Sequence, residues 1–308
     1  MSKITNIPAG FHFVATRHDD TYEFINPLKG DATNLKVLVT GASKGIGRAT
    51  VISFAKSGAS AIALLARSDL DGVAREVIEA AKQAGRKVPP KVLQLRVDTT
   101  DVAVVDRAVK TVEQEFGTLD VVINNASRME TWKPIHETDV QDWWSTWEVN
   151  VKGTYLVSRA TLPLLLKGQH KTMIVISSAG GLTTSCVFHE EAFSAKEGAG
   201  GSAYQGTKTA QIRFNDFLMK EYGEQGLLAY AVHPGGVKTE VGTTMPEHMH
   251  HLLVAEPELP ADTLVWLTRE RREWLAGRYV NAPWDMEELW RKRDEILEKD
   301  LLKLKLQT

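Results

Sequence analysis

The sequence predicts an α/β fold with one doubly wound parallel sheet and helices on both of its faces. From residue 35 onward, short apolar runs alternate with segments of helix length. A glycine-rich turn joins the first apolar run directly to the first helix-length segment. Strands of a parallel sheet that is covered by helices are apolar on both faces. Successive right-handed βαβ units then build a Rossmann-like sheet.

The expected elements follow one another in a regular order. The apolar runs expected to form strands, apolar on both faces, cover residues 36–40, 60–66, 92–97, 119–123, 173–177 and 227–232. The expected helices cover residues 46–57, 70–84, 101–116, 139–166 and 203–224. No linker rich in Pro or Ser interrupts this order, so we expect a single domain.

Three segments lie outside this alternation. We expect an N-terminal extension (1–34), a central domain (35–284) with an insertion (179–202) and a substrate lid (240–260), and a C-terminal helical tail (285–308). Asp285 is the candidate N-cap of one charged tail helix. We expect the added segments to frame the substrate entrance or to contact a neighbouring subunit.

Composition excludes several classes of function. The chain of 308 residues has 37 Lys and Arg and 39 Asp and Glu, a net charge of −2, which gives no electrostatic basis for binding nucleic acid or an anionic membrane. No apolar stretch is long enough to span a bilayer, and no secretory signal is visible, so a cytoplasmic protein is expected. The single Cys, Cys186, cannot form an internal disulfide.

The turn after the first expected strand reads TGASKGIG over residues 40–47. Its glycines allow a tight turn and a close approach of the backbone to a diphosphate, and the following helix offers free N–H donors. The expected cofactor-binding residues of this turn are Gly41, Ser43, Lys44, Gly45, Ile46 and Gly47.

This spacing of glycines resembles that of the short-chain dehydrogenase/reductase family, and the resemblance extends over about residues 35–283. Further motifs in the family's order are NNAS over 124–127, YQGTK over 204–208 and HPGGVKT over 233–239. The extension, the insertion and the Trp-bearing tail are similar to those of members from filamentous fungi that act on secondary metabolites. The resemblance implies a nicotinamide cofactor and a homodimer or homotetramer built through the helices that carry Asn150 and Tyr204.

The type of cofactor depends on the end of the second strand. An acidic side chain there would bind a ribose 2′-hydroxyl. This chain instead has Arg67 and Ser68, and Lys44 lies in the glycine turn. Two cations and a hydroxyl suit a 2′-phosphate, so we expect NADP(H). The alternative is that both cations are merely solvated.

The resemblance also implies the remaining cofactor contacts. Asp98 matches the position that contacts the adenine amino group. The other expected cofactor-binding residues are Asn125, Ala126, Tyr204, Lys208, Pro234, Gly235, Val237 and Thr239. Ser127 stands where the family usually has glycine.

Tyr204 and Lys208 are four residues apart, so both project from one face of a helix. A nearby ammonium favours the phenolate form and makes Tyr204 a usable general acid or base. The family pattern selects Ser178 as the side chain that orients the substrate oxygen, and Ser177 is the alternative. Asn150 matches the family's helix asparagine, which holds a water and completes a proton relay through Lys208.

We therefore expect an NADP(H)-dependent enzyme that reduces a ketone to a secondary alcohol, or the reverse, on a hydrophobic small molecule such as a polyketide. The apolar residues of the expected lid favour such a substrate. Alternatives are redox-neutral chemistry, such as epimerisation, dehydration or cyclisation, and a non-catalytic sensor of NADP(H). No metal is expected, because His248, His250 and His251 have no Asp, Cys or second cluster nearby.

Overall fold

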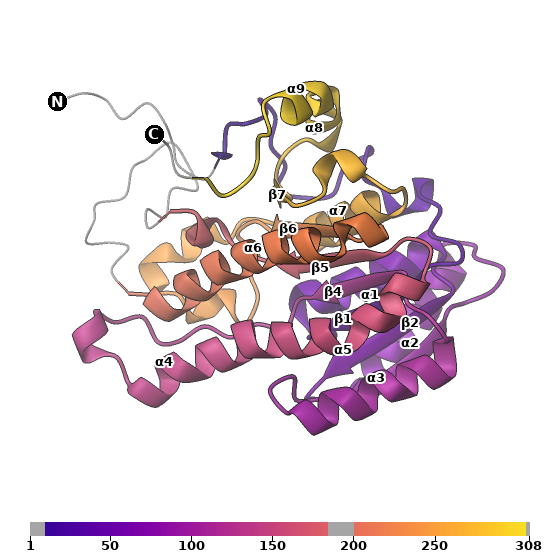
Figure 1. The fold of residues 1–308 in the computed structure, drawn as a ribbon, viewed down its shortest axis with the longest axis horizontal. Helices are drawn as coiled ribbons and strands as arrows, with labels where there is room; N and C mark the ends of the chain where they lie inside the picture. Colours follow the sequence, from indigo (N-terminus) through magenta and orange to yellow (C-terminus); the bar gives the residue numbers. More distant parts are fainter. Residues whose placement is uncertain (1–9, 184–199, 306–308) are drawn as a thin grey trace.

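The protein is described by a computed structural model over residues 10–183 and 200–305. Its centre is a wholly parallel sheet with the strand order β3-β2-β1-β4-β5-β6-β7 (Figure 1). The strands are β1 (Lys36–Thr40), β2 (Ala61–Ala66), β3 (Lys91–Arg96), β4 (Val121–Asn124), β5 (Thr172–Ile176), β6 (Leu228–His233) and β7 (Arg278–Asn281). The predicted fold class is confirmed.

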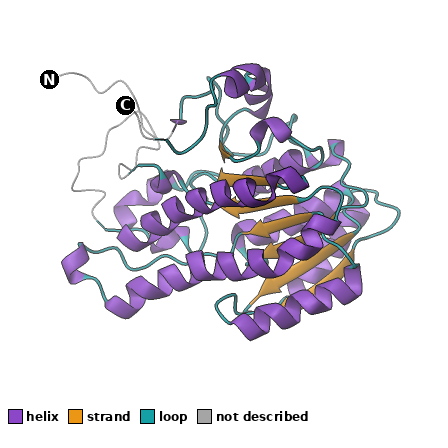
Figure 2. Cartoon of the chain, viewed as in Figure 1, coloured by secondary structure: helices purple, strands orange, loops and turns teal. Residues whose placement is uncertain are grey.

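Helices cover both faces of the sheet (Figure 2). One face is packed by α1 (Gly45–Ser57), α2 (Asp71–Gln83) and α7 (Glu258–Thr268), and the other by α3 (Val102–Phe116), α5 (Thr154–Lys167) and α6 (Ser202–Tyr222). Alternate residues of β1 pack into two hydrophobic cores, one on each face of the sheet. Val37 and Val39 belong to the core on the side of α1, and Leu38 belongs to the core on the side of α3. This division follows from the two-residue period of a strand.

The two edges of the sheet differ from the prediction. Residues 92–97 were expected to be apolar on both faces, and this is wrong, because every residue of β3 is at least partly exposed. β3 ends the strand order and has a neighbour on one side only. The opposite edge strand, β7, was not predicted, because its four residues include the polar Arg278 and Asn281.

The single helix expected over residues 139–166 is also a wrong prediction. The chain instead forms α4 (Val140–Trp147), a π-helical turn η4 (Glu148–Gly153) and then α5. A π-helical turn inserts an extra residue into a helix and is frequent at functional sites. Asn150 lies within this turn, so the irregularity determines where its side chain points.

The described part of the N-terminal extension packs against Trp284 and the start of the C-terminal tail. Trp284 is fully buried, and its Nε1 donates a hydrogen bond to the Gly10 carbonyl at 3.1 Å. Tyr22 Oη accepts from the Met286 N–H at 2.6 Å. The tail itself forms two short helices, α8 (Met286–Arg291) and α9 (Arg293–Glu298), in place of the one expected, and Asp285 caps the first of them.

Among the residues that the structure describes, no helix is long and apolar enough to cross a membrane. Most of the expected insertion, including Cys186 and the neighbouring His189, lies outside the described residues.

Candidate active site

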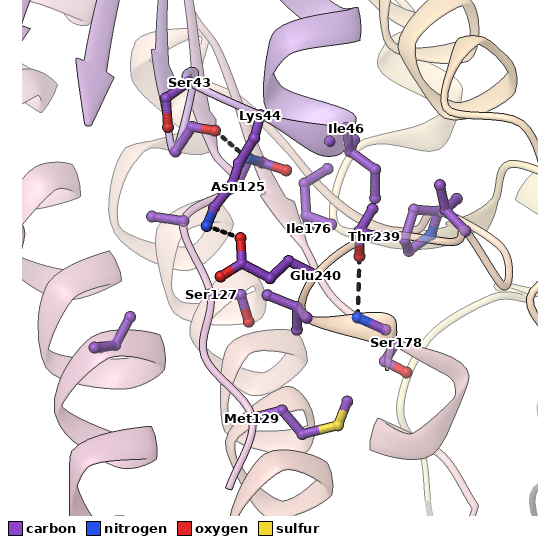
Figure 3. A pocket seen from close by; sticks show the side chains of 18 of the residues that line it. Ser43, Lys44, Ile46, Asn125, Ser127, Met129, Ile176, Ser178, Thr239 and Glu240 are labelled. Carbon is purple, nitrogen blue, oxygen red and sulfur yellow. Dashed lines mark hydrogen bonds and ion pairs between the residues drawn. The ribbon is translucent and has the colours of Figure 1, made fainter. Parts of the chain in front are cut away.

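A cavity of about 610 Å³ is lined by residues that follow strands β1 to β6. It lies where β1 and β4 are neighbours, and the chain runs outward from this point toward both edges of the sheet. Doubly wound sheets bind ligands at this position. Figure 3 shows Ser43 and Lys44 on one side of the cavity and Met129 on the other.

The glycine turn has the backbone geometry of a phosphate-binding loop. Gly41 and Gly45 have φ angles of +67° and +53°, which favour glycine. A Cβ on Gly47 would lie 2.2 Å from the Gly41 carbonyl oxygen, so that position has no room for a side chain. No described side chain caps the start of α1, and its first N–H groups are therefore available to a ligand.

The sequence-predicted residues of the turn divide into two groups. Five line the cavity: Gly41, Ser43, Lys44, Gly45 and Ile46. Gly47 does not line the cavity, because it is buried against the backbone of the turn.

Thr40 holds the turn and the segment after β4 together, and sequence reasoning missed it. Its Oγ1 accepts hydrogen bonds from the N–H groups of Asn125 and Ala126 at 3.0 and 2.9 Å. The side chain of Asn125 donates in return to the Thr40 carbonyl at 2.8 Å. These bonds fix Asn125 and Ala126, two predicted cofactor contacts, at the wall of the cavity.

The end of β2 brings Arg67 and Ser68 to the cavity, and both are exposed. Ser68 Oγ donates a hydrogen bond to Ser43 Oγ at 2.8 Å, so the two segments predicted to bind the 2′-phosphate adjoin. Lys44 forms an ion pair with Glu240, a contact that the sequence did not predict (Figure 3).

Asp98 follows β3 at the same cavity. It accepts hydrogen bonds from the N–H and the hydroxyl of Thr100 at 2.9 and 2.8 Å. Burial opposes ionisation of this carboxyl group, but the Thr100 bonds and the nearby Arg67 outweigh it and lower the pKa of Asp98. Asp98 is therefore a carboxylate that can accept a hydrogen bond.

Tyr204 and Lys208 both reach the cavity from α6. Lys208 is 1% exposed, and its Nζ donates to the Ile176 carbonyl at 2.7 Å and lies 5.2 Å from the Tyr204 ring centroid. Burial lowers the pKa of Lys208 to about 7. Burial also raises the pKa of Tyr204 to about 12, opposed by the Ser178 hydrogen bond and reinforced by the charge of Glu130.

The two candidate serines after β5 point in different directions. Ser178 lies within the influence of the Tyr204 phenol, whose pKa its hydroxyl group lowers. Ser177 is 1% exposed, and its hydroxyl donates to the Lys208 carbonyl at 3.1 Å. Of the two hydroxyl groups, the structure therefore places that of Ser178 beside the phenol.

The side chain of Asn150 is fully engaged by the protein. Its Oδ1 accepts from Arg128 N at 2.8 Å and from Ser127 Oγ at 3.1 Å. Its Nδ2 donates to Arg128 O at 2.9 Å and to Thr207 Oγ1 at 3.0 Å. All four hydrogen-bonding positions of the amide are thus used. Ser127, in place of the usual glycine, contributes one of these bonds.

The segment after β6 completes the cavity with Pro234, Gly235, Val237 and Thr239. Sequence reasoning missed the role of His233, which ends β6 and is 2% exposed. Its Nδ1 accepts from the Ala179 N–H at 3.2 Å. Burial and then the charge of Lys208 lower the pKa of His233 to about 3, so the ring is neutral and can accept this bond.

The segment expected as a lid forms two 3-10 turns, η7 (Gly242–Thr244) and η8 (Glu247–Leu252). Met245 and Leu253 line the cavity, whereas Met249 and Leu252 are buried outside it. His250 and His251 bond backbone carbonyls of the same segment. Within residues 10–183 and 200–305, no group of three His, Cys, Asp or Glu side chains is arranged to hold a metal ion.

Comparison with known proteins agrees with this geometry. A family model described as short chain dehydrogenase matches residues 35–250. The short chain dehydrogenase mpl6 of Monascus purpureus is 49% identical over 298 residues, which cover 97% of each chain. The short chain dehydrogenase andI of Emericella variicolor is 40% identical over 292 residues, which cover 95% of each chain. The predicted resemblance to members from filamentous fungi is thereby confirmed.

Solved structures share the fold. A short chain dehydrogenase from Pseudomonas syringae has a TM-score of 0.69 and 27% identity, covering 82% of this chain and 95% of that one. One from Shigella flexneri 2a, complexed with NADP, has a TM-score of 0.67 and 26% identity, covering 82% and 99%. Carveol dehydrogenase from Mycobacterium avium, in complex with NAD, has a TM-score of 0.67 at 17% identity, covering 82% and 97%, a likeness of fold alone.

Proposed function

The chain belongs to the short-chain dehydrogenase family, and from this premise we propose that it is an NADP(H)-dependent oxidoreductase. It reduces a ketone of a hydrophobic small molecule to a secondary alcohol, or catalyses the reverse reaction. The observation that carries this proposal is the meeting of Ser178, Tyr204 and Lys208 in one cavity with the glycine turn.

The residues present fit a nicotinamide dinucleotide. The glycine turn and the uncapped start of α1 suit a diphosphate. Asp98 suits the adenine amino group, and the segment Pro234, Gly235, Val237 and Thr239 suits the nicotinamide end. When bound, the cofactor supplies or accepts the hydride.

A preference for NADP(H) over NAD(H) is supported by charge. Arg67, Ser68 and Lys44 surround the end of β2, where a 2′-phosphate would lie, and none of them is acidic. A guanidinium group and an ammonium group both bind phosphate well. Glu240 pairs with Lys44, so cofactor binding requires Lys44 to exchange one anionic partner for another.

In the reducing direction, Tyr204 Oη donates its proton to the substrate oxygen while the Ser178 hydroxyl orients that oxygen. At neutral pH the phenol is protonated, because its pKa of about 12 lies well above 7. Lys208 has a pKa of about 7, so it can gain and lose a proton under the same conditions and return one to Tyr204. In the oxidising direction Tyr204 would take the proton of the alcohol as the phenolate, a form that the Lys208 ammonium and the positive ring of bound NADP⁺ would favour.

Asn150 contributes to this arrangement by holding neighbouring segments in place. Its side chain fixes residues 127–128 against α6, and its own carbonyl accepts from Gln211 Nε2 at 2.7 Å. The water of the proposed relay through Lys208 would lie beside this residue.

The cavity favours an apolar substrate. Met129, Met245 and Leu253 line it, and methionine side chains adapt to irregular apolar ligands. Relatives from Monascus and Emericella support a fungal secondary metabolite as the substrate, and within that class we propose a compound such as a polyketide.

The test is turnover of hydrophobic ketones, with 2-tetralone and 1-decalone as first probes, followed by NADPH absorbance and by product analysis. Tyr204→Phe should lower kcat by about 10²–10⁴-fold, the usual contribution of a general acid, while NADPH affinity stays close to wild type. A fully active Tyr204→Phe variant would refute the assignment. Product formation without consumption of NADPH would favour the redox-neutral alternative, and NADPH binding without turnover of any carbonyl compound would favour the sensor.

We also propose a homodimer or homotetramer built through α5 and α6. Tyr155 on α5 and Phe217 on α6 are each 50% exposed, as aromatic side chains at subunit contacts often are in a single chain. Light scattering of the purified protein measures the assembly directly.

A further inference from the structure

Glu130 is a buried carboxylate in the loop after β4, with 1% of its surface exposed. Its Oε1 accepts a hydrogen bond from Ala203 N at 2.8 Å, and its Oε2 accepts one from Tyr204 N at 2.9 Å. Both N–H groups belong to the first turn of α6, where the N-cap residue is Gly201 and brings no side chain. A side chain far away in the sequence therefore caps the helix that carries Tyr204.

Tryptophan side chains hold the same turn from other sides. A Cβ on Gly201 would lie 2.8 Å from the Trp132 ring, so this indole packs directly on the backbone. Trp143 Nε1 donates to Ser202 Oγ at 3.0 Å, and Trp147 stacks on Trp143 with ring centroids 5.7 Å apart. The start of α6 is thus seated on residues of the β4 loop and of α4.

We propose that Glu130 is a positioning residue for Tyr204: it fixes the first turn of α6 and places a carboxylate at the backbone N–H of the residue that carries the phenol. This proposal rests on the proposed function, in which Tyr204 is the general acid. A neutral Ser or Asn cap would satisfy an N–H group without burying a charge. A carboxylate at this place offers two acceptor oxygens to two N–H groups, and the dipole of α6 favours its negative charge.

Three other polar side chains lie around Tyr204. Lys208 comes from the same helix, Ser178 follows β5, and His233 ends β6 beside Lys208. Burial lowers the pKa of both Lys208 and His233 and so favours their neutral forms. Glu130 acts on the phenol in the opposite sense to the Ser178 hydrogen bond and raises the pKa of Tyr204.

The experiment measures the ionisation of Tyr204 itself. The protein is prepared with carbon-13 at the tyrosine Cζ and saturated with NADP⁺, whose positive ring brings the titration into an accessible range. The chain has 6 Tyr, and Tyr204→Phe identifies the signal that belongs to Tyr204. In Glu130→Gln, which keeps one acceptor oxygen and removes the charge, we expect the Tyr204 titration to move down by about 0.5–1 pH unit.

Glu288→Gln is the matched control. Glu288 also accepts backbone N–H bonds, from Ala15 and Thr16, but it lies in the tail. We expect it to leave the Tyr204 titration in place. A Tyr204 titration that is the same in Glu130→Gln as in the wild type would overturn the proposal, whether or not a ketone is turned over. Conversely, a shifted titration in a protein that reduces no ketone would leave the role of Glu130 standing and refute the proposed reaction.

Glu130→Asp separates position from charge. It keeps the charge but shortens the side chain, so the helix cap is weakened. We expect kcat for 2-tetralone to fall at least severalfold with little change in KM, and the Tyr204 titration to stay nearer to the wild type than in Glu130→Gln. A kcat equal to the wild type in both Glu130 variants would also overturn the proposal.

Discussion

Thr40→Val removes an acceptor at the centre of the cofactor wall while nearly preserving side-chain volume. Thr40 is 2% exposed, and its Oγ1 accepts from the N–H groups of Asn125 and Ala126. A buried N–H group that loses its partner costs about 1–3 kcal/mol. The Asn125 N–H keeps a second bond, to the Ile123 carbonyl at 3.1 Å, so mainly the Ala126 N–H loses its partner, and we expect a loss of about 1–3 kcal/mol in the free energy of unfolding.

Thr40→Ser is the control for this substitution. It keeps the hydroxyl group and removes one methyl group, at a cost of about 1 kcal/mol. Urea unfolding of the two variants and the wild type gives the midpoints and slopes from which the free energies follow. Titration with NADPH, followed by its fluorescence, should show weaker binding for Val and nearly wild-type binding for Ser, because only Val releases the backbone of Asn125 and Ala126.

The relative stabilities of Thr40→Val and Thr40→Ser test this reasoning. If Thr40→Val is no less stable than Thr40→Ser, the two hydrogen bonds do not hold the turn against the β4 loop. If Val is less stable but binds NADPH as tightly as the wild type, the bonds stabilise the fold without shaping the cofactor wall.

Two further predictions concern ionisable groups at the cavity. His233 has a pKa of about 3 in the folded chain and of 6.5 in the unfolded chain. Between these values only the unfolded chain binds the extra proton, so the free energy of unfolding decreases as the pH is lowered below 6.5. Acidification from pH 7 to pH 5 should cost the wild type about 1–2 kcal/mol more than His233→Gln in urea unfolding, and equal losses would contradict this. Glu240→Gln frees Lys44 from an exposed ion pair, so thermal stability should barely change. The affinity for NADPH should rise severalfold and that for NADH should not, as calorimetric titration of each would show; a greater gain for NADH would argue against a 2′-phosphate at this site.

The fold was predictable because its strands are almost wholly apolar. β2, β5 and β6 are buried along their whole length, which an uninterrupted apolar run reveals. β7 is equally buried but has only four residues, two of them polar, so its sequence carries no such signal. The π-helical turn η4 was also beyond prediction, because the sequence around Asn150 has the ordinary period of a helix.

The candidate site was predictable where chemistry depends on fixed local spacing. The glycine turn and the pair Tyr204 and Lys208 are of this kind. Glu130 and Thr40 act on residues more than seventy positions away, so only the folded chain reveals their partners. Neither residue belongs to a motif, and each looks like an ordinary polar residue in the sequence.

The packing of the tail against β7 has a consequence for association between molecules. An open edge strand presents unpaired N–H and C=O groups that invite the edges of other sheets. On β7, the Tyr279 N–H donates to the Leu302 carbonyl at 2.8 Å, so the tail occupies part of this edge. The other edge, β3, is protected by charge instead, with exposed Lys91 and Arg96 at its two ends. The segment around Leu302 therefore shields part of this edge, and a protein shortened before Leu302 would leave the backbone of β7 open to pairing with other chains.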